Sequence, residues 1–393
     1  MAGSFVNVRT LYHTARAVQG LVGSEYESDV SRPLRRRLWL WRRGFLSRSD
    51  AVYDLDSENY RDYVSDYERF VGTKQINGTW SVALSNKLLF HRFMQSFDAE
   101  QMTVYGLLRD GTYHPVDGRR GREMADGGPT VPEPIGIGGP ASEPARSSPR
   151  TETRNAAQRV VDRLEVEGRL VLKWVHGGGG NNVMLCSRAD DGYRVDGDHY
   201  AEAEFRSLVA DLEDYLVCEF VDQGTFPAAL YPATPNTIRL ITMYDDVLDE
   251  PFIAAAIQRI GTTDSVPLDN FTQGGLSASI DRRTGELGPG AQPPDSDGDG
   301  DGVEWHSEHP DTGMAIEGKQ IPGWQRIRSR VLEMADACSY LPYVGWDVIV
   351  TDDDGGFTVI EANSYPGLKS IQVHGPLLTD DRIRRFYEQH GVR

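Results

Sequence analysis

The chain has very few lysines. Of its 41 basic residues only five are lysines, at positions 74, 87, 173, 319 and 369, and the remaining 36 are arginines. Acidic residues number 59, so the formal net charge is −18. Hydrated acidic surfaces keep a protein soluble at molar salt, where self-repulsion is screened. This composition predicts a halophilic source, and it argues against nucleic-acid binding because that attraction would be screened as well.

Cysteines and long apolar runs are also scarce. The three cysteines, Cys186, Cys218 and Cys338, are widely spaced and form no CxxC pair, which argues against a zinc site and indicates a reducing compartment. No signal peptide is recognisable, and no apolar stretch has the length of a membrane span. We therefore expect a cytoplasmic protein.

Changes in composition divide the chain into five segments. Residues 1–80 are predicted to form a helical N-terminal region, and residues 81–114 to contain an amphipathic helix over 81–97 and a short strand. Residues 115–154 are rich in Gly, Pro, Ser and Arg, which is typical of a low-complexity insertion. Residues 155–222 and 223–393 contain apolar strands and amphipathic helices, and the last segment carries an acidic insertion at 288–303.

The most informative pattern lies in the last segment, where two apolar runs flank an Asp/Gly cluster and predict a β-hairpin. With the turn centred near Asp354, Asp347 lies opposite Glu361, and Asn363 points to the same face as Glu361. Facing carboxylates need a positive charge between them, and Mg²⁺ in ATP-using enzymes is held by one or two carboxylates. The pattern therefore predicts a magnesium site at Asp347, Glu361 and Asn363. An exposed hairpin whose acids diverge is the alternative.

A glycine-rich hairpin is predicted around residues 169–185. Lys173 lies on its first strand, and four glycines whose amides could close over phosphates follow it. They are Gly177, Gly178, Gly179 and Gly180. A glycine hairpin without a ligand is the alternative. In so lysine-poor a chain Lys87, near the start of the helix over 81–97, also invites a functional explanation, although a surface lysine on an amphipathic helix fits equally well.

Three further polar residues stand out from their surroundings. Arg239 lies within an apolar strand, and because a lone buried charge costs several kcal/mol we expect a partner, with a phosphate favoured. Glu219 interrupts the strand 215–221, which is either a hinge that reads an adenine edge or a core strand. Asn270 precedes the turn Gly274-Gly275, which either approaches a ligand closely or is a plain loop.

A basic stretch interleaved with tryptophans occupies residues 32–43. Such a stretch could lie on an anionic membrane surface. We favour a helix that buries Leu38, Trp39 and Trp41 and pairs its arginines with acids, because salt would screen the membrane attraction.

The acidic insertion contains an imperfect calcium-loop pattern. Its matching positions are Asp297, Asp299, Asp301, Gly302 and Glu308. Glu304 occupies a position that is usually apolar, and prolines and glycines upstream forbid an entering helix. A solvated acidic insertion is therefore favoured over a calcium site.

The chain resembles the ATP-grasp superfamily in the order of four features. These are a strand that carries a lysine and leads into a glycine hairpin, a strand that carries an acid, a strand that carries an arginine, and a hairpin with the pattern Asp…Glu-x-Asn. Four motifs look like the superfamily's branch of sugar-transfer-associated ATP-grasp proteins. They are Asn236-Thr237-Ile238-Arg239, Asp269-Asn270-Phe271 with Gly274-Gly275, Gly345-Trp346-Asp347 and Glu361-Ala362-Asn363. The resemblance runs from about Phe45 to Leu378, and it departs at Trp174, where superfamily members usually carry proline.

The resemblance implies an α+β fold with α/β-type layers, in which a nucleotide lies between two subdomains and residues 155–222 form the lid. It implies ATP with Mg²⁺ or Mn²⁺ as cofactors. The implied nucleotide contacts are Lys87, Lys173, the glycines Gly177 to Gly180, and a hinge at Glu219, Phe220 and Val221. Arg239 and Asn270, with Lys173, would steady the transferring phosphoryl group, and Asp347, Glu361 and Asn363 would bind the metal.

The activity implied by the resemblance is that of an ADP-forming carboxylate–amine ligase, which activates a small-molecule carboxylate as an acyl phosphate. The family name connects the substrates to sugars or surface polymers. A kinase that uses the same site and a non-catalytic, membrane-associated interaction protein are the alternatives. No nucleic-acid partner is expected, and peripheral membrane contact is the less favoured interpretation.

Overall fold

A computed structural model describes residues 18–26, 30–97, 101–116, 156–176, 182–294 and 302–393 of the chain. These residues form two compact units. Unit 1 takes its described residues from Met1–Gln101 and Val221–Arg393, and unit 2 takes them from Met102–Gly177 and Asn182–Phe220. The chain thus passes from unit 1 to unit 2 inside the range 81–114, which the sequence analysis treats as one segment.

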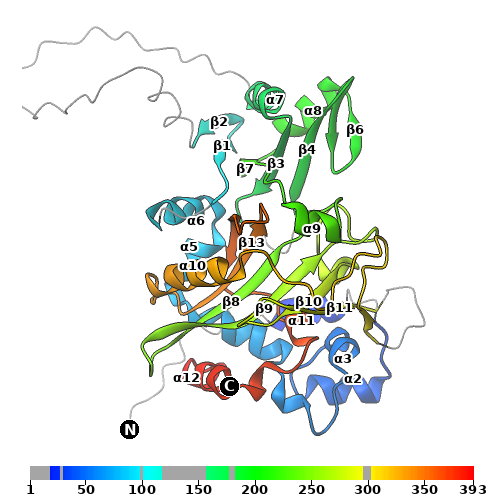
Figure 1. The fold of residues 1–393 in the computed structure, drawn as a ribbon, viewed down its shortest axis with the longest axis vertical. Helices are drawn as coiled ribbons and strands as arrows, with labels where there is room; N and C mark the ends of the chain where they lie inside the picture. The colour runs from blue at the N-terminus through cyan, green and yellow to red at the C-terminus, as the bar shows by residue number, and fades with distance from the viewer. Residues whose placement is uncertain (1–17, 27–29, 98–100, 117–155, 177–181, 295–301) are drawn as a thin grey trace, which may run out of the picture. The chain divides into compact units, whose positions relative to one another are not determined.

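Unit 2 is built on an antiparallel seven-stranded sheet with the strand order β2-β1-β7-β3-β4-β5-β6 (Figure 1). The strands are β1 (Val104–Arg109), β2 (Thr112–Pro115), β3 (Arg169–Trp174), β4 (Val183–Ala189), β5 (Gly192–Val195), β6 (Asp198–Tyr200) and β7 (Tyr215–Glu219). The helices α7 (Ala156–Glu167) and α8 (Glu202–Ala210) bury their apolar side chains against Leu170 and Leu172 of β3 in one cluster. Side chains alternate along a strand, so Lys173 projects from the opposite face of this sheet.

Unit 1 contains the second antiparallel seven-stranded sheet, with the order β12-β11-β10-β9-β8-β13-β14. Its strands are β8 (Ile238–Asp245), β9 (Glu250–Ile260), β10 (Leu276–Ile280), β11 (Leu287–Gln292), β12 (Glu304–His306), β13 (Tyr343–Val350) and β14 (Phe357–Asn363). The tight turn between β13 and β14 forms because Asp352 Oδ1 accepts hydrogen bonds from the amides of Asp354 and Gly356 at 2.9 and 2.7 Å. The hairpin predicted from the sequence is therefore present.

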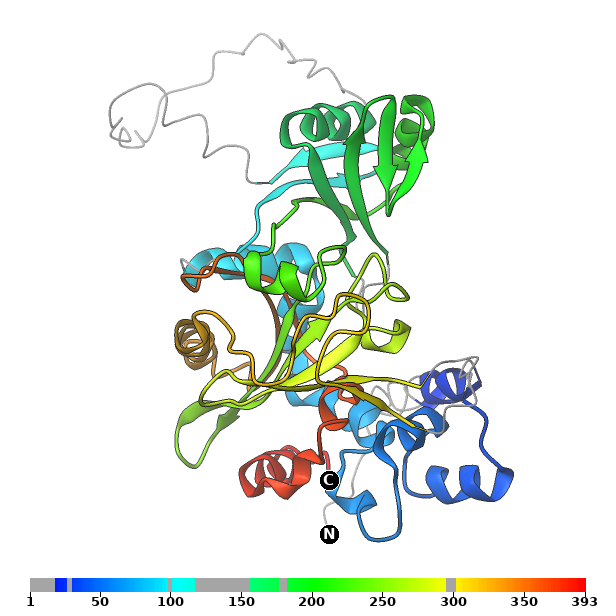
Figure 2. The ribbon, with the colours of Figure 1, turned by 45° about the vertical axis from the view of Figure 1, so that its right-hand side comes forward.

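Helices cover both faces of the unit 1 sheet (Figure 2). One face packs against α5 (Val82–Ser85), α6 (Lys87–Met94), α9 (Thr225–Leu230) and α10 (Trp324–Asp336). The other face packs against α11 (Lys369–Gln372) and α12 (Asp381–Gln389). The N-terminal helices are α2 (Leu34–Trp41), α3 (Ser47–Tyr53) and α4 (Lys74–Ile76). Short 3₁₀ turns lie at Tyr60–Asp62, Gly78–Ser81, Gln95–Phe97, Phe271–Gln273 and Leu377–Thr379, and a π-helical turn lies at Glu68–Thr73.

The segment before α6 ties together the ends of two strands that carry predicted site residues. The side-chain amide of Asn77, which is buried, donates to the carbonyl of Tyr343 at 2.6 Å, and its oxygen accepts from the amide of Tyr343 at 3.2 Å. Nearby, the buried Gln372 exchanges two hydrogen bonds with the backbone of Val64. These long-range contacts fix the N-terminal segment against the C-terminal hairpin.

Two expectations about helices are wrong in detail. The helix expected over 81–97 is interrupted at Asn86, whose side chain caps α6 by accepting from the amide of Leu89 at 3.0 Å. Leu89 is exposed, whereas Phe90 and Met94 are buried. In α2, Leu40 is buried, while Leu38 and Trp41 are 43% and 42% exposed rather than buried.

The low-complexity segments are only partly described by the structure. The predicted insertion at 115–154 lies almost wholly outside the described residues, as do Asp297, Asp299 and Asp301 of the calcium-loop pattern. The acidic insertion predicted at 288–303 begins too early, because Leu287–Gln292 forms β11 and pairs with β10. Among the described residues, no helix is long and apolar enough to cross a membrane.

Candidate functional site

The predicted metal site lies on one face of the unit 1 sheet. Asp347 on β13 pairs directly with Glu361 on β14, and Gly345 pairs with Asn363. Alternation along β14 places Glu361 and Asn363 on the same face, while Ala362 between them joins the apolar core on the other face. Asp347 is 5% exposed, so its carboxylate needs partners within the protein.

Arg239 is the first partner of Asp347. The two residues are paired across β8 and β13, and the guanidinium binds the carboxylate through two hydrogen bonds, one of them from Nη2 to Oδ2 at 2.7 Å. Burial lowers the pKa of Arg239, but the charge of Asp347 and its hydrogen bonds outweigh this and raise the pKa above its usual value. The expected partner of this buried cation is, within the protein, the carboxylate of Asp347.

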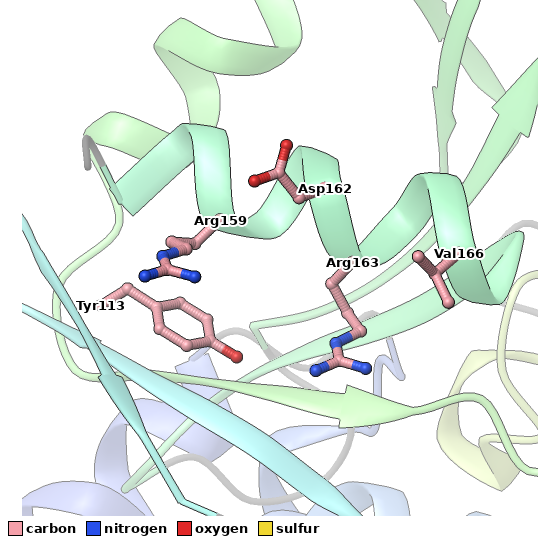
Figure 3. A pocket seen from close by; sticks show the side chains of 5 residues that line it. All are labelled: Tyr113, Arg159, Asp162, Arg163 and Val166. Carbon is pink, nitrogen blue, oxygen red and sulfur yellow. The ribbon is translucent and has the colours of Figure 1, made fainter. Parts of the chain in front are cut away.

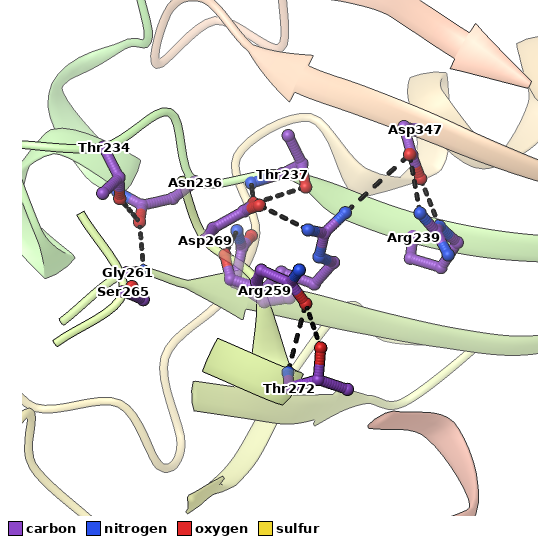
Figure 4. A network of polar contacts seen from close by, with 12 residues as sticks. Thr234, Asn236, Thr237, Arg239, Arg259, Gly261, Ser265, Asp269, Thr272 and Asp347 are labelled. Carbon is purple, nitrogen blue, oxygen red and sulfur yellow. Dashed lines mark hydrogen bonds and ion pairs between the residues drawn. The ribbon is translucent and has the colours of Figure 1, made fainter. Parts of the chain in front are cut away.

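A second arginine, missed in the sequence analysis, extends this group of charges (Figure 4). Arg259 on β9 binds Asp269 at 2.6 Å and lies 3.8 Å from Oδ2 of Asp347. Asp269 also accepts from the amide of Thr237 at 2.8 Å and from its hydroxyl at 2.5 Å. The signal that could have revealed Arg259 is the one used for Arg239, an arginine within an apolar strand, in the run 250–260.

Lys87 completes the group on the β14 side. This lysine, at the first turn of α6, is 7% exposed, and its Nζ lies 3.7 Å from Oε1 of Glu361. It is therefore not a surface lysine. Ion pairs join Asp269, Arg259, Asp347 and Arg239, and Glu361, which faces Asp347, pairs with Lys87. We call these six residues the charged row.

Lys173 lies in unit 2 and has a different environment. It is 8% exposed, and within the described residues the only hydrogen-bond partner of its ammonium is Sδ of Met102 at 3.3 Å. A thioether is a weak acceptor, so the positive charge is buried without an acid. An unpaired buried cation aimed away from the helical face of the sheet is suited to bind an anion. Gly177, Gly178, Gly179 and Gly180 lie outside the described residues.

The predicted hinge residues lie at the end of β7. Oε2 of Glu219 accepts from the amide of Thr103 at 2.9 Å, and the amide of Glu219 donates to the carbonyl of Thr103 at 3.0 Å. The guanidinium of Arg169 lies over the ring of Phe220, 4.4 Å from its centroid. Val221 follows directly, where the chain returns to unit 1.

Asn270 organises the loop that follows β9. Its side-chain oxygen accepts from the amide and the hydroxyl of Thr272 at 3.1 and 3.0 Å. Gly274 has a φ of +94°, and the amide of Gly275 donates to the carbonyl of Asn270 at 3.1 Å. The two glycines are thus explained by closure of the loop, which leaves Asn270 half-buried beside Asp269 of the charged row.

The oxygen donors on β13 and β14 are of the kind that suits magnesium. Two facing carboxylates and an amide oxygen match the hard ligands of Mg²⁺, which usually keeps waters and substrate phosphates as its other ligands. The described residues contain no cluster of three or more His, Cys, Asp or Glu side chains that could hold a metal alone. The three side chains alone are an incomplete donor set for Mg²⁺, which takes octahedral coordination.

A separate cavity of about 240 Å³ lies in unit 2 (Figure 3). It is lined by Tyr113, Arg159, Asp162, Arg163 and Val166. Arg163 already pairs with Glu167 at 3.1 Å and lies over the ring of Tyr105. The cavity borders α7, which packs on the face of the sheet opposite to Lys173, so none of the predicted site residues lines it.

Comparison with known protein families shows to which family the chain belongs. The model of the sugar-transfer associated ATP-grasp family matches residues 125–384. The chain belongs to this family. The matched range contains Lys173, Arg239, Asp347, Glu361 and both sheets except β1 and β2 of unit 2. The ATP-grasp assignment expected from the motifs is thus confirmed.

Solved structures that resemble this family member have low sequence identity to it. The ADP complex of N5-carboxyaminoimidazole ribonucleotide synthetase is 10% identical with a TM-score of 0.35, over 73% of this chain and 46% of that chain. Biotin carboxylase from Campylobacter jejuni is 11% identical with a TM-score of 0.37, over 79% and 47%. D-alanine–D-alanine ligase from Coxiella burnetii is 12% identical with a TM-score of 0.35, over 88% and 66%. The chain thus spans less than half the length of the first two. No curated protein matches it by sequence.

Proposed function

We propose that this member of the sugar-transfer associated ATP-grasp family is an ATP- and Mg²⁺-dependent ligase that joins a carboxylate to an amine. The observation that carries the proposal is the charged row, in which Asp347, Arg239 and Glu361 stand side by side on three adjacent strands. All three belong to motifs on which the family resemblance rests. Burying such a group is unfavourable for folding alone, which supports a role in binding a charged ligand.

In this proposal Asp347, Glu361 and Asn363 hold a divalent cation, Mg²⁺ or Mn²⁺. When bound, the ion neutralises charge on the phosphates of ATP. Arg239 would donate hydrogen bonds to the transferring phosphoryl group, and Asn270 would steady that group from the neighbouring loop. Lys87 would bind phosphate oxygens as a compact point charge, and Lys173 is the anion-binding cation proposed for unit 2. Glu219, Phe220 and Val221 read the adenine or ribose.

The chemistry requires no nucleophile from the protein. A carboxylate oxygen of the substrate attacks the γ-phosphorus, the bond to the β–γ bridging oxygen breaks, and ADP and an acyl phosphate form. The amine of the second substrate then attacks the acyl carbon, phosphate leaves, and the amine gives up a proton. The charged groups contribute by positioning and by stabilising the charge that develops.

The substrates proposed are small carboxylates and amines, and the family name connects them to sugars or surface polymers. All three cysteines are buried and outside disulfides, and the pKa values of Cys186 and Cys338 are raised by burial, to about 12 and about 11. Buried thiols outside disulfides support a cytoplasmic location for this ATP-dependent reaction.

The first test is nucleotide binding by thermal unfolding in molar KCl with ATP and MgCl₂. Ligand at 100 times its dissociation constant should stabilise the wild type by about 2.7 kcal/mol. The shift should shrink in Glu361→Gln and in Lys173→Ala, while Glu388→Gln, which changes an exposed acid on α12, should keep it. A folded wild type that gives no shift at saturating nucleotide would contradict the proposal.

The second test distinguishes a ligase from a kinase. With a panel of carboxylates and hydroxylamine in place of the amine, an acyl phosphate gives a hydroxamate together with ADP. A kinase would instead release ADP with a stable phosphate ester and no hydroxamate. MgATP binding combined with an ester product would leave the nucleotide site standing and overturn the ligase assignment.

A further inference from the structure

The outward face of α2 exposes an apolar stripe. Leu34, Leu38 and Trp41 are 66%, 43% and 42% exposed. They lie four and three residues apart, so they line one side of the helix. Leu40 on the opposite side is fully buried and anchors α2 to unit 1. Three large exposed apolar side chains on an eight-residue helix are not explained by folding or by the proposed ligase site.

The arginines of this region divide into two groups. Those that face inward are paired: Arg32 and Arg36 bind Asp50, and Arg37 binds Glu25 at 3.1 Å. Arg35 and Arg42 are exposed, and among the described residues their guanidiniums have no ion-pair partner. These two residues are seven apart, so they lie on the same side of α2, beside the apolar stripe.

We propose that the outward face of α2 docks the protein on a membrane surface that contains anionic lipids. The three apolar side chains would enter the boundary between headgroups and acyl chains, and Arg35 and Arg42 would bind lipid phosphates. This local charge is opposite to the net charge of −18 on the whole chain, so the two arginines give α2 a charge complementary to anionic headgroups.

The small size of this surface favours a lipid over a protein partner. A stable protein interface buries about 800 Å² on each side, which a helix of about 12 Å with three exposed apolar side chains does not supply. A fluid bilayer requires no complementary groove. α2 also lies at the edge of unit 1, beside α3 (Figure 1).

Vesicle sedimentation tests the proposal with the full chain. Vesicles of phosphatidylcholine with phosphatidylglycerol should bind the wild type, and vesicles of phosphatidylcholine alone should bind it weakly. Loss of each arginine in Arg35→Gln/Arg42→Gln should weaken binding by about fivefold. Leu34→Ser/Leu38→Ser/Trp41→Ser should weaken it by tenfold or more on both kinds of vesicle.

Two control variants match these changes elsewhere in unit 1. Val247→Ser/Leu248→Ser removes two apolar side chains that are 71% and 58% exposed in the β8–β9 turn, and Arg385→Gln removes an exposed arginine on α12. Both should bind vesicles like the wild type. An unchanged thermal shift with MgATP in all variants would separate loss of docking from misfolding or from failure of the nucleotide site.

The dependence of binding on KCl and the depth to which Trp41 inserts give two further measurements. Raising KCl should remove the contribution of the arginines and leave that of the apolar stripe. Brominated lipids should quench tryptophan fluorescence in the wild type but much less in Trp41→Phe. The proposal is overturned if wild type binds neither kind of vesicle, if the serine variant binds as well as wild type, or if the stripe instead mediates self-association that the serine variant abolishes.

Discussion

Replacing Lys173 by Met should stabilise the ligand-free protein while weakening its affinity for MgATP. The ammonium of Lys173 is buried, and its hydrogen-bond partner within the described part of the chain is the weak acceptor Sδ of Met102. Exchanging a buried charge for an apolar side chain of similar volume stabilises proteins by about 1–4 kcal/mol in favourable cases. We expect Lys173→Met to raise the free energy of unfolding of the ligand-free protein by an amount within this range, because the substitution leaves no acid of the described residues without its partner.

Lys87 provides a matched control with the opposite sign. It is buried to the same degree as Lys173, but its Nζ lies 3.7 Å from the carboxylate of Glu361. Lys87→Met leaves that carboxylate without its cation, so we expect the free energy of unfolding to fall by about 1–3 kcal/mol. Both variants should lose part of the stabilisation that MgATP gives the wild type.

Calorimetry with and without MgATP measures both effects in the same samples. With an unfolding entropy of about 2.1 cal/mol/K per residue, one kcal/mol corresponds to a change in Tm of about 1 °C for this chain of 393 residues, and calorimetry resolves differences of this size. The reasoning fails if Lys173→Met lowers the Tm of the ligand-free protein, or if both variants shift it in the same direction. An MgATP shift of wild-type size in Lys173→Met would show that this lysine does not touch the nucleotide.

Three further predictions concern stability. Arg239→Met should lower the free energy of unfolding by about 3 kcal/mol in urea titrations. This is the lower end of the cost of breaking a buried ion pair, because a second arginine remains 3.8 Å from Asp347. An unchanged urea midpoint would contradict this prediction. Burial lowers the pKa of His374 to about 4, so this group stays neutral in the folded protein. Its contribution to the free energy of unfolding is full above pH 6.5 and should fall by up to about 3 kcal/mol as the pH drops to 4. A His374→Gln variant should lack this pH-dependent loss of stability. Asp66 is buried, which raises its pKa, but Lys369 at 2.7 Å and several hydrogen bonds hold the pKa below its usual value. Lys369→Met should therefore raise the pH at which acid unfolding begins. Identical acid midpoints in wild type and variant would exclude this ion pair as a contributor to acid stability.

The hairpin could be predicted because local signals mark its two strands and its turn. Alternating β-branched residues and an Asp/Gly turn locate both strands, and the facing pair Asp347 and Glu361 is present as predicted. Near the turn the register differs by one residue from the predicted register, because Val350 pairs with Phe357. A bulge separates this part of the hairpin from the pair Asp347 and Glu361. This one-residue irregularity is what brings Glu361 opposite Asp347, and nothing local in the sequence marks it.

What the sequence could not provide is the choice of partners over long distances. Arg239 was recognisable as a buried cation, but its partner Asp347 lies 108 residues later, and Arg259 approaches Asp347 because β9 and β13 both pair with β8. For α2 the periodicity was readable, but which side faces unit 1 depends on Asp50 and Glu25 in other segments. Periodicity identifies a stripe and does not determine whether that stripe is covered.

The charged row explains why the site in unit 1 would bind an anion with a metal rather than either alone. Its three acids and three bases balance one another, so a divalent cation added at Asp347 and Glu361 would create an excess of positive charge. The phosphates of ATP would offset this excess. A metal without nucleotide should therefore stabilise the protein far less than MgATP, and nucleotide without metal should also bind weakly.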